Sequence, residues 1–150
     1  MPTFNANSVL KTPITCSQAG QVLASIGEYE VPDTLAANDI IALCSLPAEH
    51  EPVDFILQAD DLDTNGVPTL TLTAAVLNAG KTDVVASTDF LTASTIGQAG
   101  GVARADKVLG LQLASSNADR IVGVKVANVA ATKAAGTLRG ILTYRRKASA

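Results

Sequence analysis

The chain has 150 residues, of which 47% are hydrophobic and only 3% aromatic, and its formal net charge is −3. This length fits one domain with a sizeable core, which the composition predicts to be aliphatic. The shortage of aromatic rings argues against a protein that binds bases or sugars by stacking.

The N-terminal segment, "MPTFNANSVLKTPITC", has no basic start followed by an apolar block, so it does not predict a signal peptide. No window approaches the ~18 apolar residues of a membrane span. We therefore expect a soluble protein that is made in the cytoplasm and has no membrane partner. Cys16 and Cys44 lack metal-ligand spacing, and buried, reduced thiols are expected for both. Residues 1–19 are polar and predict an extended N-terminal arm before a single β domain over 20–150.

Most of the chain shows the alternating apolar pattern of short strands. The clearest case is "TLTLTAAVLN", where leucine, alanine and valine alternate with threonine. The segments predicted as strands are 20–31, 39–46, 53–59, 69–78, 107–114, 120–129 and 137–147. The sequence "AEHEP" between the second and third predicts a loop that exposes His50.

The period changes between Lys81 and Gly101. Phe90, Leu91, Ser94 and Thr95 follow helical spacing, with Ser87 or Thr88 as a possible N-cap and two glycines as a stop. The sequence predicts one short helix or a long ordered loop here. The fold class is therefore all-β: a jelly roll, barrel or sandwich of about seven to eight strands with one short helical insertion.

The string "DLDTNG" matches the first half of a calcium-binding loop, with Asp61, Asp63 and Asn65 as candidate ligands. The bidentate glutamate that such a loop needs at its twelfth position is replaced by Leu72. Asn65-Gly66 is itself a strong turn signal. We therefore interpret the segment as a tight turn between 53–59 and 69–78 with solvated carboxylates, and keep a weak divalent-cation site as the alternative.

The sequence predicts no enzyme and no cofactor. His50 is the only histidine, and three aspartates on a polar loop are expected to be ionised together rather than to form an acid–base pair. The glycines at 97, 100 and 101 do not have the spacing of a dinucleotide-binding or phosphate-binding loop.

Charge is distributed unevenly along the chain. Residues 1–80 carry ten acidic residues and one basic residue, and residues 81–150 carry four acidic and ten basic residues. Local cancellation within one fold explains this pattern, and so does docking against another copy or another protein. The tail "TYRRKASA" places Arg145, Arg146 and Lys147 together, as a solubilising tail or as a basic foot on an acidic surface. Three side chains are a small footprint for nucleic acid, which is not an expected partner.

Two stretches carry a resemblance to a known family. "ADDLDTNGVPTLTLTAAVLNAG" and "RIVGVKVANVAATKAAGTLRGILTYRRK" resemble small virion proteins of tailed bacteriophages, the capsid decoration or cement proteins of Bordetella-type podophages. The likeness covers about 53–147. It implies a compact jelly roll or barrel on the capsid exterior, without catalytic residues.

The resemblance implies two partners, the major capsid protein and a second copy of the chain, with a homodimer favoured and a trimer possible. We expect a protein that cements the capsid by bridging neighbouring capsomers. A tail, baseplate or connector component and a calcium-dependent ligand-binding module are the alternatives. The predicted interface residues are Phe4, Val9 and Leu10 in the arm and the three basic residues of the foot.

Overall fold

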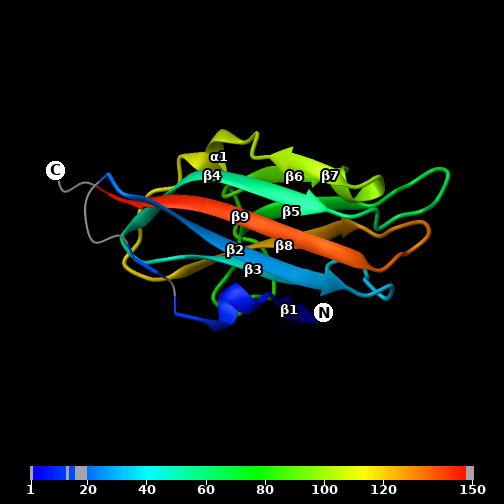
Figure 1. Ribbon diagram of the computed structural model, residues 1–150, viewed down its shortest axis with the longest axis horizontal. Helices are drawn as coiled ribbons and strands as arrows, with labels where there is room; N and C mark the ends of the chain where they lie inside the picture. Colours follow the sequence, from blue (N-terminus) through cyan, green and yellow to red (C-terminus); the bar gives the residue numbers. More distant parts are fainter. Residues whose placement is uncertain (1, 13, 16–19, 148–150) are drawn as a thin grey trace.

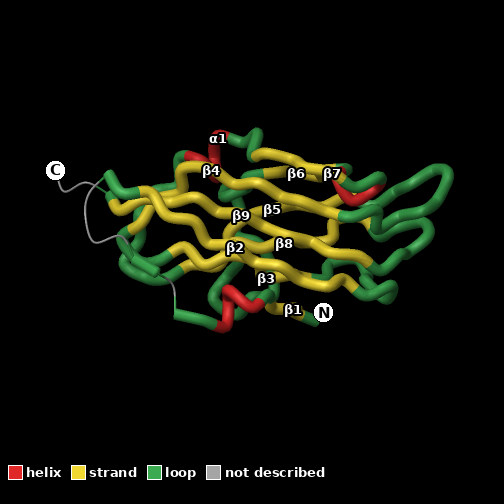
Figure 2. Tube along the Cα trace, viewed as in Figure 1, coloured by secondary structure: helices red, strands yellow, loops and turns green. Residues whose placement is uncertain are grey.

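Two β-sheets pack face to face in a sandwich (Figures 1 and 2). The computed structural model describes residues 2–12, 14–15 and 20–147. Sheet A has the strand order β1 (Thr3–Asn5), β3 (Ile40–Leu46), β8 (Arg120–Asn128), β5 (Thr71–Val76) and β6 (Leu91–Ser94). Sheet B has the order β2 (Val22–Val31), β9 (Gly136–Arg146), β4 (His50–Ala59) and β7 (Gly101–Arg104). The all-β prediction is confirmed, as a sandwich rather than a closed barrel.

The core lies between the sheets because alternate side chains of each strand point inward. Val122, Val124 and Val126 of β8 are fully buried, and so are Leu138 and Leu142 of β9. Burying one such aliphatic side chain stabilises the fold by roughly 1.5–3 kcal/mol. A smaller apolar cluster on the outer side of sheet A is built from the following residues: Ile40, Ala42 and Leu77, with Val9, Val84 and Ile121 against them.

Of the two alternatives for 81–101, the short helix is not present as an α-helix, and the stretch is not one long loop either. This stretch contains β6, the 3-10 helix η2 (Ile96–Gln98) and the start of β7. Ser87 and Ala93 both have positive φ, which interrupts any helix. Phe90 is buried, and its N–H donates to Ala74 O of β5 at 2.8 Å. Pairing with sheet A has therefore overridden the local helical spacing.

The predicted strand over 107–114 is also wrong, because it contains the short helix α1 (Val108–Leu111). Its backbone is tied to the preceding segment rather than to a neighbouring strand: Gly110 N–H donates to Asp89 O at 2.9 Å. A Cβ on Gly110 would lie 2.8 Å from the Phe90 ring. Because Gly110 has no Cβ, the backbone of α1 can pack directly on the Phe90 ring.

The "AEHEP" segment is not an exposed loop around His50. β4 begins at His50, whose side chain is buried. Its Nδ1 lies 2.7 Å from Ala48 O, and its ring meets Tyr144 edge-on with 5.5 Å between centroids. The two flanking glutamates, which made this segment look solvated in the sequence, form ion pairs with arginines of β9.

Half of the predicted arm is part of the sandwich. β1 pairs in parallel with β3, and η1 (Asn7–Leu10) follows it along the lower edge in Figure 1. Ala6 is buried, and its N–H donates to Ala42 O at 2.8 Å. None of the helices in the described part of the chain is long and apolar enough to cross a membrane.

The two sheets approach each other closely at the β2–β3 edge. Gly27 of β2 faces the backbone of Leu43, and a Cβ added there would lie 1.8 Å from Leu43 O. Ser45 N–H donates to Ser25 Oγ at 3.0 Å across the same edge. Cys44 is buried beside this contact, as predicted; Cys16 lies outside the described residues.

Candidate interaction surfaces

The acidic segment after β4 is a crossing between sheets and not a hairpin turn. β4 belongs to sheet B and β5 to sheet A, so residues 60–70 pass from one layer to the other. Asn65 does form a local turn, since its Oδ1 accepts from Val67 N–H at 2.9 Å. The prediction of a tight turn between 53–59 and 69–78 is therefore wrong.

Asp63 is a buried structural residue rather than a solvated one. Its carboxylate accepts four backbone N–H groups, at distances of 2.7 to 3.0 Å. Two donors, Thr69 and Leu70, precede β5, and the other two, Ala131 and Thr132, lie in the β8–β9 connection. Burial opposes ionisation, but these donors outweigh it and hold the pKa of Asp63 well below its usual value. Asp63 thus fastens two loops at one end of the sandwich.

The other two candidate cation ligands are arranged differently. Asp61 and Asn65 are both exposed; Asp61 Oδ1 accepts from Asp63 N–H at 3.1 Å, and Asn65 Nδ2 donates to Thr132 Oγ1 at 2.9 Å. In the part of the chain that the structure describes, no three His, Cys, Asp or Glu side chains are grouped to hold a metal ion. The oxygens of Asp63 already serve N–H donors, which favours the loop-fastening role.

The outer face of sheet B, hereafter the sheet B face, holds an open groove and a row of aliphatic side chains. Three isoleucines lie side by side on it, because Ile26 of β2 pairs with Ile141 of β9, which pairs with Ile56 of β4. Ile26 is 56% exposed. The alternation in 20–31 and 53–59 indicates the outward direction of Ile26 and Ile56, but the sequence could not reveal that the two strands flank β9.

The uneven charge distribution cancels largely within the fold. The basic strand β9 lies between the acidic strands β2 and β4. On the sheet B face Arg139 pairs with Glu28, and Arg145 pairs with Glu51 at 2.8 Å. Among the described residues, Arg104–Asp54 and Arg146–Glu49 also join the two halves of the chain, whereas Lys125–Asp83 lies within the second half.

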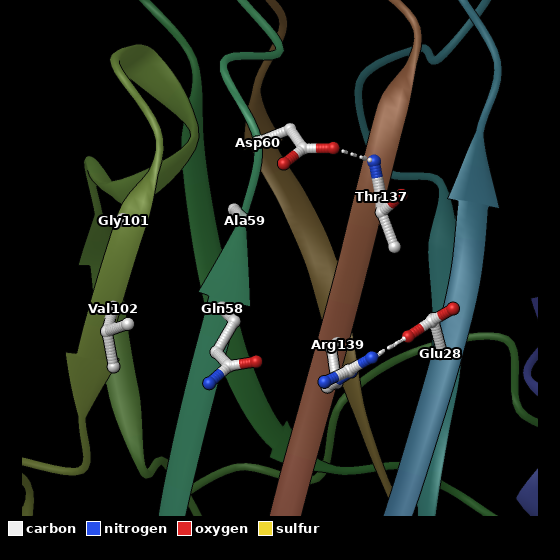
Figure 3. A pocket seen from close by; sticks show the side chains of 8 residues that line it. All are labelled: Glu28, Gln58, Ala59, Asp60, Gly101, Val102, Thr137 and Arg139. Carbon is white, nitrogen blue, oxygen red and sulfur yellow. Dashed lines mark hydrogen bonds and ion pairs between the residues drawn. The ribbon is translucent and has the colours of Figure 1, made fainter.

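An open groove of about 530 Å³ lies at one end of the sheet B face. Figure 3 shows Val102, Gln58, Arg139 and Glu28 aligned across its four strands. Asp60 closes the end of the groove and accepts from Thr137 N–H at 2.7 Å. The groove is shallow and polar, which suits a protein surface better than an enclosed small molecule.

The predicted arm residues divide into two kinds. Phe4 is half-buried against Tyr29, with 5.4 Å between ring centroids, and Val9 packs on the cluster outside sheet A. Leu10 is 71% exposed. Ile14, which is not among the predicted interface residues, is exposed to a similar degree. We call Leu10 and Ile14 the arm ridge. Leu10 therefore remains available to a partner, whereas Phe4 and Val9 help to hold the arm in place.

The three basic residues of the foot lie together at the end of β9. They line a second open groove, of about 380 Å³, with Gly20 and Glu51. Arg145 and Arg146 are ion-paired to Glu51 and Glu49, as described above. Lys147 is exposed and has no ion pair within the described residues. The foot therefore offers one unpaired cation rather than three.

Comparison with known proteins gives a consistent answer. No protein-family model matches the sequence, and no curated protein does so either. A chain in the solved capsid of Ralstonia phage GP4 is 36% identical, with a TM-score of 0.88, and the match covers 99% of this chain and 100% of that one. A chain in the capsid asymmetric unit of cyanophage Pam1 is 32% identical, with a TM-score of 0.73, over 94% and 97% of the two chains.

The sandwich and these two likenesses together define a structural protein of the phage virion. The chain belongs to the family of phage capsid proteins that the GP4 and Pam1 chains represent. The resemblance to phage virion proteins drawn from the acidic segment and the C-terminal strands is confirmed at this level.

Proposed function

We propose that this protein decorates and cements the outside of a phage capsid by bridging neighbouring capsomers, and that it is no enzyme. The observation that carries the proposal is the match to chains of two phage capsids over almost the whole length of each.

A protein that holds neighbouring capsomers together must resist deformation, and it therefore needs a rigid fold. The sandwich meets this need through its apolar core and through the fastening of its ends, by Asp63 at one end and by His50 and Tyr144 at the other. A stiff module that contacts two capsomers adds buried area across the seam where the shell would open. Each contact can be weak, because many copies act on one closed shell and linked contacts raise the effective concentration.

The surfaces proposed to meet the major capsid protein are the arm ridge and the foot. The arm ridge supplies exposed aliphatic side chains next to a well-anchored segment. Lys147 supplies a cation that lacks an ion pair within the described residues. An apolar contact with a charged neighbour gives both affinity and orientation.

The proposal is tested with heads of the phage that encodes this chain, prepared without it and then supplied with the purified protein. We expect saturable binding to expanded heads, poor binding to unassembled capsid subunits, and a higher temperature of DNA release. A Leu10→Ser variant should bind more weakly, whereas Val67→Ser, at an exposed valine in the crossing between β4 and β5, should bind normally. Heads that neither bind the protein nor gain heat resistance would refute the proposal.

A further inference from the structure

The arm is fastened to the sandwich at two points, one before Leu10 and one after it. The first is η1, where Ser8 Oγ donates to Leu43 O. The second is Ile14, whose carbonyl oxygen accepts a hydrogen bond from the Tyr144 hydroxyl at 2.5 Å. From η1 the arm runs towards the end of the sandwich where β9 ends (Figure 1). One member of the arm ridge therefore lies between the two fastenings, and the other carries the second.

Tyr144 is a fixed point for the arm. Its side chain is buried, and it belongs to β9, which pairs with β2 on one side and with β4 on the other. The His50 ring meets it edge-on, as described above. A buried tyrosine hydroxyl needs a hydrogen-bond partner, and Ile14, which supplies this one, lies 130 residues away in the sequence. The hydroxyl thus links the core of the sandwich to the arm.

The arm beyond η1 has little else to hold it. Residues 11–12 and 14–15 are exposed, and within the described part of the chain they make a single hydrogen bond, the one from Tyr144. An open groove of about 160 Å³ separates this stretch from the β2 edge, with Lys11, Thr12 and Ile14 on one side and Ala24 and Ile26 on the other. Because of this groove, close packing does not replace the hydrogen bond. The position of the stretch therefore depends on one hydroxyl.

The fastened arm presents its apolar side chains and does not hide them. Leu10 is 71% exposed and Ile14 is 72% exposed while the bond from Tyr144 is formed. Release of the arm would therefore leave the arm ridge no more accessible than it already is. Release would add conformational freedom, which a partner would have to remove on binding at a cost in affinity. The bond from Tyr144 should thus strengthen any contact made by the arm ridge.

We propose that Tyr144 is a positioning residue for the contact with the shell: its buried hydroxyl holds Ile14, and with it the arm ridge, in the form that the shell binds. The inference rests on the proposed function, in which the arm ridge meets the major capsid protein. It adds that a core side chain, itself out of reach of the shell, sets the strength of that contact.

The fastening is tested on the purified full chain by limited digestion with trypsin, which can cleave the arm after Lys11. Tyr144→Phe keeps the ring and removes only the hydroxyl. Because one hydrogen bond changes such an equilibrium by roughly threefold to tenfold, we expect cleavage after Lys11 to accelerate by about that factor. Circular dichroism checks that the variant is folded.

Tyr29→Phe is the matched control for the digestion. Tyr29 is the other of the two tyrosines, and its hydroxyl makes no hydrogen bond within the described residues. This variant should be cleaved after Lys11 at the wild-type rate. Equal rates for Tyr144→Phe and the wild type would overturn the proposal. Faster cleavage of Tyr144→Phe throughout the chain would overturn it too, because the whole fold would then have loosened.

Phage heads that lack the protein test the positioning role. Tyr144→Phe should bind them about threefold or more weakly than the wild type, and Tyr29→Phe should bind normally. In a chain that already carries Leu10→Ser and Ile14→Ser, adding Tyr144→Phe should change the remaining binding little, because no arm ridge is left to position. A further loss of the same size in that chain would overturn the positioning role.

The two experiments separate this proposal from the proposed function. If Tyr144→Phe is cleaved faster after Lys11 but binds heads as well as the wild type or more tightly, the positioning role is wrong and the cementing role stands. If heads bind no form of the protein, the cementing role is wrong and the positioning role falls with it. The digestion with trypsin would still decide whether Tyr144 fastens the arm.

Discussion

Arg139 on β9 forms an ion pair with Glu28 on β2, although 111 residues separate them in the sequence. The two residues are direct partners in the antiparallel ladder. Exposed ion pairs of this kind contribute only ~0.2–1 kcal/mol each to the free energy of unfolding. They also favour the observed register of β9 between β2 and β4, which aligns opposite charges across both ladders.

Asp63→Asn is expected to destabilise the fold. An amide offers one acceptor oxygen in place of two charged ones, so at least one of the backbone donors would lose its partner. We expect a fall in melting temperature on the order of 5 °C. Asp33→Asn, at an exposed aspartate, is the control and should melt like the wild type. Equal melting temperatures for Asp63→Asn and the wild type would contradict the fastening role.

The stability that Asp63 contributes is expected to depend on pH. Its pKa in the folded protein is held below the ordinary value of 3.8, so the folded state favours the ionised form. The contribution is complete above about pH 5 and declines as the pH falls below 3.8 towards the folded pKa. Denaturation at pH 7 and at pH 3 should therefore show a smaller difference between wild type and Asp63→Asn at the lower pH. A difference that grows on acidification would have the wrong sign.

Gly27→Ala tests the close contact between the two sheets. The added Cβ would overlap Leu43 O, and backbone atoms cannot move aside as the end of a side chain can. We expect a loss of about 3 kcal/mol or more in the free energy of unfolding, or a failure to fold. Gly66→Ala, where no atom lies within 4 Å of the new Cβ, should change little. A Gly27→Ala protein as stable as Gly66→Ala would show that the sheets are farther apart than described.

Cys44 is expected to be unreactive in the folded protein. Burial raises the pKa of its thiol to about 12, despite hydrogen bonds from Gly27, Leu142 and Ser25 that act in the opposite direction. At pH 8 the reactive thiolate is therefore scarce and is also shielded. In a Cys16→Ser variant, a thiol reagent should label no cysteine until denaturant is added. Rapid labelling of the native variant would mean that the core around Cys44 opens readily.

Strands buried on one face were predictable from sequence, because alternation is a local property. The predicted strands at 120–129 and 137–147 match β8 and β9 to within one residue at each end. The helix considered within 81–101 and the strand predicted at 107–114 were wrong, because distant partners decide the structure of both stretches. Phe90 receives its hydrogen bonds and packing from β5 and α1, which its own sequence neighbourhood does not reveal.

The functional surfaces were predicted less completely. Leu10 and the foot are exposed, but Phe4 and Val9 pack mainly within the chain. From the sequence, Asp63 was interpreted as one of several solvated carboxylates. Its burial could not be predicted, because the backbone N–H groups that donate to it lie up to 69 residues away in the sequence. The isoleucine row was missed because its members come from three strands that only the sheet order brings together.

The most direct test of the central claim is an image reconstruction of the intact phage particle by cryo-electron microscopy. The account predicts density that fits this sandwich on the outer surface of the shell, in contact with more than one capsomer, with the arm ridge and the foot against the shell. Density for the sandwich confined to the tail, or bound within a single capsomer, would contradict it.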